Sequence, residues 1–135
     1  MKKILILALG ALAMISCAKQ PCDARHTCWA YDATIYELNT RQATPEGTFA
    51  AAEALLPELK ESGVDIIWIM PIQKIGVLER KGTLGSYYAI TDYCEFNPEF
   101  GTRADFEHFL AKAHELGMKV ILDWVANHTA PDSEW

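Results

Sequence analysis

Short apolar runs alternate with longer amphipathic segments along most of the chain. Residues 33–38, 64–70 and 119–125 are dominated by β-branched, aromatic and aliphatic side chains, which predicts three strands. The second run is almost continuously apolar, so we expect it to be buried on both faces, as strands of a parallel sheet are.

The segment after the first strand has the apolar spacing of a helix. Thr48 is a suitable N-cap, and the pattern continues through Lys60, with Gly63 as the stop. Pro57 lacks the N–H that would reach the carbonyl of Glu53, so we expect a kink or a break near it.

A second helix is predicted before the third strand. Thr102 and Asp105 form a capping box, with Asp in place of the usual Glu or Gln. Gly117 supplies the stop. The apolar stripe of this helix consists of Phe106, Phe109, Leu110, Ala113 and Leu116.

The elements therefore follow the order strand, helix, strand, loop, helix, strand. Two consecutive βαβ units predict an α/β fold with parallel strands and right-handed crossovers. Residues 39–42 are expected to begin a loop. The connection over residues 71–101 is far longer than the usual two to six residues, which favours a functional role for it.

The N-terminus is typical of a targeting segment. Lys2 and Lys3 precede an apolar run over residues 4–15 that is too short to span a bilayer. The run ends in Met-Ile-Ser-Cys at Cys17, which resembles the lipobox of bacterial lipoproteins. By that resemblance residues 1–16 are a signal peptide, Cys17 is lipidated and residues 17–32 are a tether. An ordinary secretory signal with an incidental cysteine is the alternative.

Either signal predicts export. The lipoprotein-type signal further predicts a location in the periplasm or at the outer membrane, with membrane contact only through the lipid anchor. The formal net charge is −6, and removal of Lys2 and Lys3 would take it to −8 through the loss of two positive charges. Such a surface disfavours nucleic acid and anionic lipid, and suits a soluble enzyme or a binder of neutral ligands.

Three cysteines remain after Cys17. An oxidising compartment would permit a disulfide between Cys22 and Cys28, and two free thiols in a flexible tether are the alternative. Cys94 is expected to be a small packing residue without a partner. No Cys and His spacing matches a zinc site.

Three polar residues gather where the third strand ends: Asp123, Asn127 and His128. Polar groups at the carboxyl end of a buried strand rarely contribute to a hydrophobic core and often form a functional site. This stretch is therefore the first candidate for a functional site.

The spacing Asp123-x-x-x-Asn127-His128 resembles the first conserved region of the alpha-amylase family of glycoside hydrolases. Residues 36–42 and 64–72 resemble the first and second strands of that family. Gly85-Ser86-Tyr87-Tyr88 and the following residues to 102 resemble the loop between its second strand and second helix. The resemblance covers residues 33–135.

This resemblance implies a TIM (β/α)₈ barrel, of which the first three strands and two helices are present. Such barrels need roughly 250 residues, so we expect residues 33–135 to be the N-terminal part of a catalytic barrel. The implied reaction is retaining hydrolysis of α-glucans such as starch or maltodextrin, in carbohydrate metabolism. The family's catalytic carboxylates follow later strands, so we expect the 135-residue chain alone to be inactive. The first and third strands would be bare edges of a buried-type sheet, so we also expect this chain alone to be insoluble or molten.

The resemblance also implies roles for single residues. Tyr88 would stack on a sugar, and His128 would donate a hydrogen bond to a hydroxyl of the same sugar. Asp92 and Asp123 would support the site, and Asn127 would ligate calcium together with residues of later loops. For Tyr88 and His128 the alternatives are a packing role in the loop and a structural histidine at the strand end.

Two other functions remain open at this point. One is a transglycosidase or isomerase of the same family, and the other is a carbohydrate-binding homologue without catalytic carboxylates. The sequence that follows residue 135 would separate them, through a Gly-x-Arg-x-Asp motif, then a strand-end Glu, then His-Asp.

Overall fold

The structure is a computed structural model, and it describes residues 27–135. It divides into two compact units, Met1–Asp32 and Ala33–Trp135. The described part of the first unit contains one short 3₁₀ turn, η1 (Cys28–Ala30). Cys28 is disulfide-bonded. Cys17, Cys22 and the predicted signal peptide lie outside the described residues, so the Cys22–Cys28 pairing stays a prediction.

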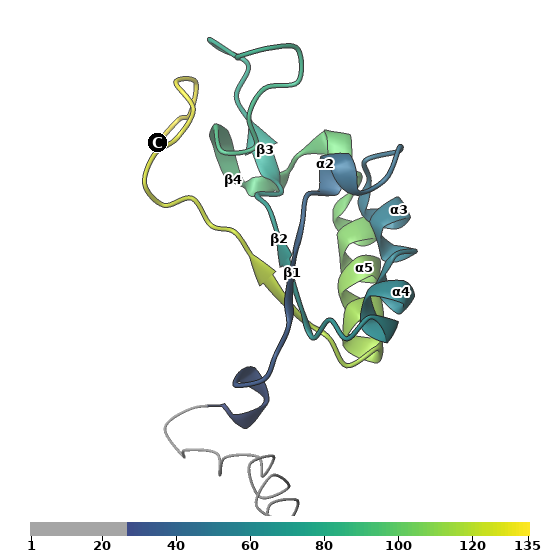
Figure 1. Ribbon diagram of the computed structural model, residues 1–135. Helices are drawn as coiled ribbons and strands as arrows, with labels where there is room; N and C mark the ends of the chain where they lie inside the picture. The colour runs from purple at the N-terminus through teal and green to yellow at the C-terminus, as the bar shows by residue number, and fades with distance from the viewer. Residues whose placement is uncertain (1–26) are drawn as a thin grey trace, which may run out of the picture. The chain divides into compact units, whose positions relative to one another are not determined.

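A three-stranded parallel sheet forms the centre of the second unit, as the sequence predicts (Figure 1). Its strands are β1 (Ile35–Leu38), β2 (Ile66–Ile69) and β5 (Lys119–Leu122), in the order β1-β2-β5. The observed strands are shorter than the predicted ones. β5 ends at Leu122, so Asp123 lies directly after the strand.

The first predicted helix is broken, as its proline suggests. It forms α3 (Phe49–Glu53) and α4 (Leu56–Glu61). Thr48 caps α3 by accepting a hydrogen bond from the Ala51 N–H. The break precedes Pro57, which lies in the first turn of α4, where a missing N–H costs no helical hydrogen bond.

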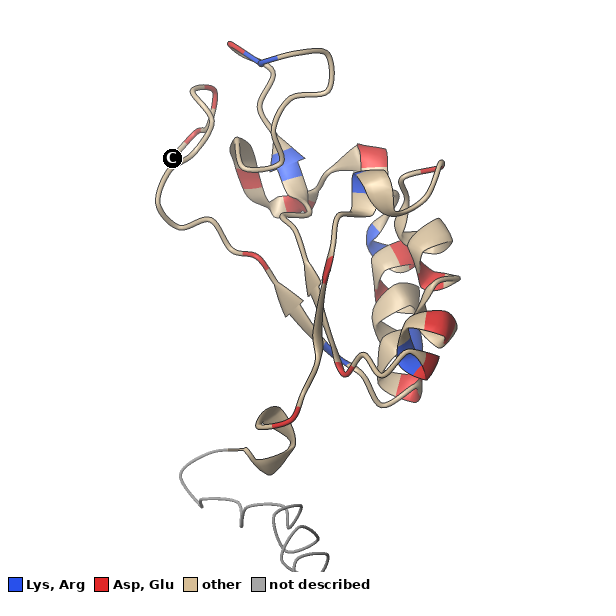
Figure 2. Ribbon diagram, in the orientation of Figure 1, with Lys and Arg blue, Asp and Glu red and all other residues tan. Residues whose placement is uncertain are grey.

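The second predicted helix is α5 (Arg103–Glu115), and its capping box is present. The Thr102 hydroxyl accepts from the Asp105 N–H, while the Asp105 carboxylate accepts from the Thr102 N–H at 2.7 Å. Figure 2 marks acidic and basic residues interspersed along α4 and α5. None of the helices in the described part is long and apolar enough to cross a membrane.

The core lies between these helices and one face of the sheet. Phe49 is at its centre, with ring centroids 6.1, 5.9 and 5.3 Å from those of Phe96, Phe100 and Phe106. Other large, fully buried members come from strands, helices and the connection before β5: Leu38, Leu56, Ile67, Ile69, Phe109 and Met118.

The opposite face of the sheet carries apolar side chains that are partly exposed in the described residues. Ile35, Trp68 and Ile121 are 54%, 38% and 45% exposed. Trp68 and Ile121 are register partners, so they lie on one face. Such a face is buried in folds whose parallel sheet closes on itself into a barrel.

Two predictions about the connecting segments were wrong. Residues 40–43, expected in a loop, form the short helix α2 (Thr40–Ala43), so the described residues contain more helices than the two expected. The long connection is also not irregular throughout. It holds an antiparallel pair, β3 (Gln73–Ile75) and β4 (Ile90–Phe96), and the 3₁₀ turn η2 (Pro98–Phe100).

Candidate functional site

The candidate site forms at the carboxyl ends of β2 and β5. The Asp123 N–H donates to the Ile69 carbonyl at 2.9 Å, which continues the β2–β5 pairing by one residue and fixes Asp123 beyond the strand. The Tyr88 hydroxyl donates to Asp123 Oδ2 at 3.0 Å. This hydrogen bond brings the long loop after β2 to the end of β5.

The environment of Tyr88 keeps its hydroxyl protonated. Burial raises the pKa of Tyr88 above its ordinary value, and the hydrogen bond to the Asp123 carboxylate raises it further. The phenol is therefore a donor at neutral pH, and its ring is held in one orientation.

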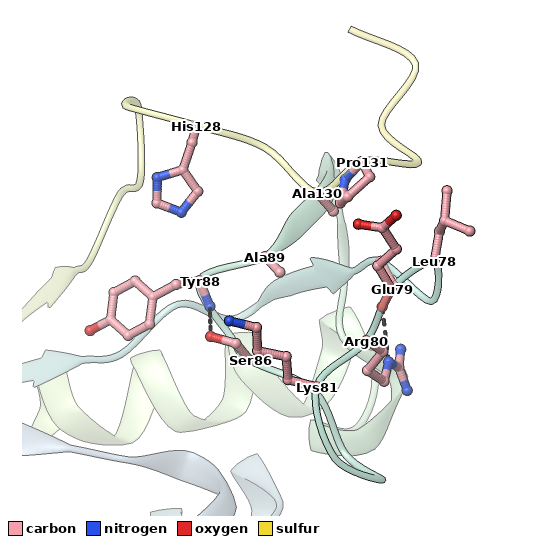
Figure 3. A pocket seen from close by; sticks show the side chains of 11 residues that line it. Leu78, Glu79, Arg80, Lys81, Ser86, Tyr88, Ala89, His128, Ala130 and Pro131 are labelled. Carbon is pink, nitrogen blue, oxygen red and sulfur yellow. Dashed lines mark hydrogen bonds between the residues drawn. The ribbon is translucent and has the colours of Figure 1, made fainter.

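Tyr88 and His128 line one cavity of about 310 Å³ (Figure 3). This volume is at the lower end of the range for small-molecule sites. Its remaining lining comes from the loop after β3 and the segment after β5: Gly76, Leu78, Glu79, Arg80, Lys81, Ser86, Ala89, Ala130 and Pro131.

His128 is exposed and its imidazole is oriented by Asn127. The Asn127 Nδ2 lies 3.3 Å from His128 Nδ1. The donor and acceptor roles in this contact depend on the tautomer of the ring. The other ring nitrogen, Nε2, can bond a ligand in the cavity as donor or acceptor.

The backbone of this segment is held by β4. The Tyr93 hydroxyl donates to the carbonyls of Val125 and His128, the latter at 3.1 Å. The Tyr93 ring stacks on Trp135 with a centroid separation of 5.0 Å. The position of residue 128 is thus set by contacts that do not involve its own side chain.

Asp92 lies apart from the cavity-lining residues. Its Oδ1 accepts from the Cys94 N–H at 2.8 Å, so its carboxylate supports the local shape of β4. Cys94 is free, as expected, but it is exposed, so the expectation of a packing role was wrong.

The calcium prediction for Asn127 depends on residues outside this chain's described part. Among the described residues, no group of three or more His, Cys, Asp or Glu could hold a metal ion. Asn127 would supply one amide oxygen, while calcium takes six to eight oxygen ligands. The described residues alone therefore do not fit the ion.

Sequence reasoning missed Arg41, which links α2 to the loop before Tyr88. Arg41 forms a two-point ion pair with Glu99, with Nε–Oε1 and Nη2–Oε2 both at 2.6 Å. It lies in a segment that was expected to be a loop. Its side chain is only 12% exposed, and nothing in the local sequence indicates a partner 58 residues away.

Asp132 was also missed, and it anchors the other end of the same loop. Its Oδ2 accepts from the N–H groups of Val77 and Leu78 at 2.7 and 3.2 Å. Gly76 makes this approach feasible, since a Cβ there would lie 2.5 Å from Ala130 Cβ and closer still to Asp132 Oδ1. The hydrogen bonds from Val77 and Leu78 lower the pKa of the Asp132 carboxyl.

The fold and the site together define a class. Parallel strands are covered by helices on one face and carry polar side chains at their carboxyl ends, as in (β/α)₈ barrel enzymes. The chain belongs to the alpha-amylase family, because residues 32–135 match the alpha-amylase catalytic domain.

Similar proteins agree with this assignment. The chain is 38% identical over 116 residues to an alpha-amylase of Haloarcula japonica, covering 84% of this chain and 16% of that protein. It is 37% identical over 121 residues to an alpha-1,4-glucan:maltose-1-phosphate maltosyltransferase of Rhodospirillum rubrum, covering 76% of this chain and 17% of that protein.

The fold agrees with a solved structure as well. An alpha-amylase of Lactobacillus plantarum superimposes with a TM-score of 0.74 at 53% identity, over 76% of this chain and 24% of that one. The predicted fold class, the first strands of a TIM barrel, is confirmed. The chain spans less than a quarter of the length of each of these three proteins.

Proposed function

We propose that this chain forms the N-terminal part of a retaining glycoside hydrolase that acts on α-glucans such as starch or maltodextrin. The observation that carries the proposal is the Tyr88–Asp123 hydrogen bond at the strand ends, beside His128 in the same cavity. The family assignment and the hydrolase relatives support it.

In this proposal the described residues bind and orient the sugar. The flat ring of Tyr88 complements the C–H face of a pyranose, and Asp123 holds that ring through the phenol. His128 donates from Nε2 to a sugar hydroxyl. Retaining hydrolysis needs a nucleophilic carboxylate and an acid/base carboxylate, which the proposal assigns to later strands of the complete polypeptide.

The proposal includes export and attachment to a membrane by a lipid on Cys17. Its support is the basic pair Lys2 and Lys3, the apolar run after them and the lipobox-like ending at Cys17.

The decisive experiment uses the polypeptide translated from the complete reading frame that contains residues 1–135, called the complete polypeptide below. Purified complete polypeptide is expected to release reducing sugar from a maltooligosaccharide. Its sequence is expected to contain Gly-x-Arg-x-Asp, a strand-end Glu and His-Asp after residue 135. A complete polypeptide without that Asp and Glu would instead support the carbohydrate-binding alternative.

The variant His128→Ala tests the assigned binding role in the complete polypeptide. Loss of one oriented hydrogen bond to the sugar is expected to lower turnover by about 10- to 100-fold without unfolding the protein. His114→Ala is the matched control, because His114 is an exposed histidine on α5. Equal turnover of His128→Ala and wild type would refute the role given to His128.

A transferase is the second candidate, and the maltosyltransferase relative favours it. The same sugar site would serve both reactions, because they differ in whether water or a second sugar accepts the glycosyl group. Product analysis of the complete polypeptide with a maltooligosaccharide and excess acceptor sugar separates them. Hydrolysis gives shorter products only, whereas transfer also gives longer ones.

A further inference from the structure

Arg41 makes several polar contacts, some of which reach the segment before Tyr88. Beyond its ion pair with Glu99, its Nη1 donates to the Gly85 carbonyl at 3.0 Å and its Nη2 donates to the Leu84 carbonyl at 3.2 Å. Its guanidinium lies over the Tyr87 ring, 4.3 Å from the centroid. One side chain on α2 thus contacts three residues of the segment that leads to Tyr88: Leu84, Gly85 and Tyr87.

Tyr87 is fixed on its other sides as well. Its hydroxyl accepts a hydrogen bond from Asn39 Nδ2 at 3.0 Å, and its ring lies 6.5 Å from that of Phe100 in the core. The rings of Tyr87 and Tyr88 have centroids 6.5 Å apart. Because adjacent residues share a peptide plane, fixing Tyr87 and Gly85 limits where Tyr88 can lie.

The chemistry of the contact suits a fixed brace. Hydrogen bonding to Glu99 raises the pKa of Arg41 above its ordinary value, so the guanidinium stays charged. Its planar fork bonds Glu99 at two points and both carbonyls with the remaining N–H groups. A lysine ammonium could not reproduce this geometry.

We propose that Arg41 is a positioning residue for the sugar site. Arg41 holds the segment Leu84–Tyr87, called the brace segment. It thereby keeps the Tyr88 ring in the orientation in which the Tyr88 hydroxyl donates to Asp123. Arg41 itself does not line the cavity, so its effect on the cavity must pass through the brace segment. The assignment rests on the proposed function, since it gives Tyr88 a sugar to bind.

The variants are made in the complete polypeptide. Arg41→Ala removes every contact, and Arg41→Lys keeps the charge but loses the fork. Arg103→Ala is the matched control. Arg103 is the first residue of α5, and its guanidinium also lies over an aromatic ring, 5.1 Å from the centroid of Phe96. Two readouts are taken: hydrogen exchange of the backbone amides of residues 84–88, and kcat/KM on a maltooligosaccharide.

Arg41→Ala is expected to speed exchange of the 84–88 amides by about tenfold or more and to lower kcat/KM by about 10- to 100-fold. Arg41→Lys is expected to lie between Arg41→Ala and wild type in both readouts. Arg103→Ala should remain within about twofold of wild type in both. Exchange at wild-type rates in Arg41→Ala would overturn the proposal.

A double-mutant cycle separates positioning from general stability. If Arg41 works through the Tyr88 ring, then Arg41→Ala should cost much less kcat/KM in a Tyr88→Ala background, which lacks that ring, than in wild type. Equal costs in both backgrounds, or faster exchange with unchanged kcat/KM, would show that Arg41 does not position Tyr88. If the wild type hydrolyses no α-glucan, the proposed function fails, while the exchange data still decide whether Arg41 braces residues 84–88.

Discussion

The helix-covered sheet and the layer that carries the site are held together by different forces. The sheet region, β1, β2 and β5 with α3 to α5, is joined by an apolar cluster in which many side chains are fully buried. The site layer consists of β3, β4, the loop between them and residues 123–135. Its contacts include several hydrogen bonds, such as those that Asp132 accepts and Tyr93 donates, besides a smaller number of buried apolar side chains, Ile75, Ile90 and Val125.

This difference separates stability from function. Burial of apolar surface is non-directional, and it gives a scaffold its free energy of unfolding. Hydrogen bonds are directional, and each contributes little net stability while fixing angles and distances. The sheet region should therefore respond to loss of volume, and the site layer to loss of specific donors, acceptors and charges.

The largest effect is expected from Phe49→Ala in the sheet region. Phe49 is 1% exposed and contacts three other rings, so its removal leaves a cavity in the core. We expect it to lower the free energy of unfolding by about 3–5 kcal/mol. The measurement is denaturant unfolding of the complete polypeptide.

Val77→Ala is the control in the site layer. Val77 is 71% exposed, so its truncation should change the unfolding free energy by less than about 0.5 kcal/mol. Similar losses in Phe49→Ala and Val77→Ala would contradict the distinction between the two regions.

A smaller effect is expected from Gly76→Ala. The added Cβ would collide with Asp132 and Ala130, so the segment after β5 must shift, at a cost of about 1–3 kcal/mol. Gly82→Ala is the comparison, because its Cβ would meet nothing within 4 Å and the variant carries only left-handed backbone strain. Thermal melting of both variants should show the larger loss for Gly76→Ala; the reverse order would argue against the close packing at Gly76.

The smallest effect is a pH dependence confined to the site layer. The folded pKa of Asp132 is lowered, so its contribution to stability is present above the ordinary value of 3.8 and is lost as pH falls through the folded pKa. Exchange of the Val77 and Leu78 amides, corrected for intrinsic rates, should therefore accelerate below about pH 4.

In Asp132→Asn the group that titrates is gone. Exchange of the same two amides should then be faster than in wild type near neutral pH, and the acid step should disappear. An acid step of equal size in Asp132→Asn would assign the effect to another carboxylate.

The parts of the fold that depend on local pattern could be predicted from the sequence. The parallel strands follow from apolar runs, the α5 capping box from the spacing of Thr102 and Asp105, and the helix break from Pro57. Each of these signals lies within a few residues of the feature that it determines.

The missed features depend on partners far along the chain. α2 is one turn long and packs against η2, and β3 has only three residues with an irregular register to β4. Ile90, Thr91 and Tyr93 are strand-forming residues that could have indicated β4. Nothing local could have indicated that Arg41 pairs with Glu99 or that Asp132 accepts from Val77.

The shared hydrogen bond of Tyr93 has a consequence for how the cavity can diversify. Because Tyr93 holds the main chain at Val125 and His128, residue 128 presents whatever side chain it carries at the same place. A single substitution at 128 would therefore exchange the chemical group offered to a ligand while the surrounding walls stay where they are. Position 128 is thus a natural point for selection, in evolution or in the laboratory, to retune which ligand the cavity prefers.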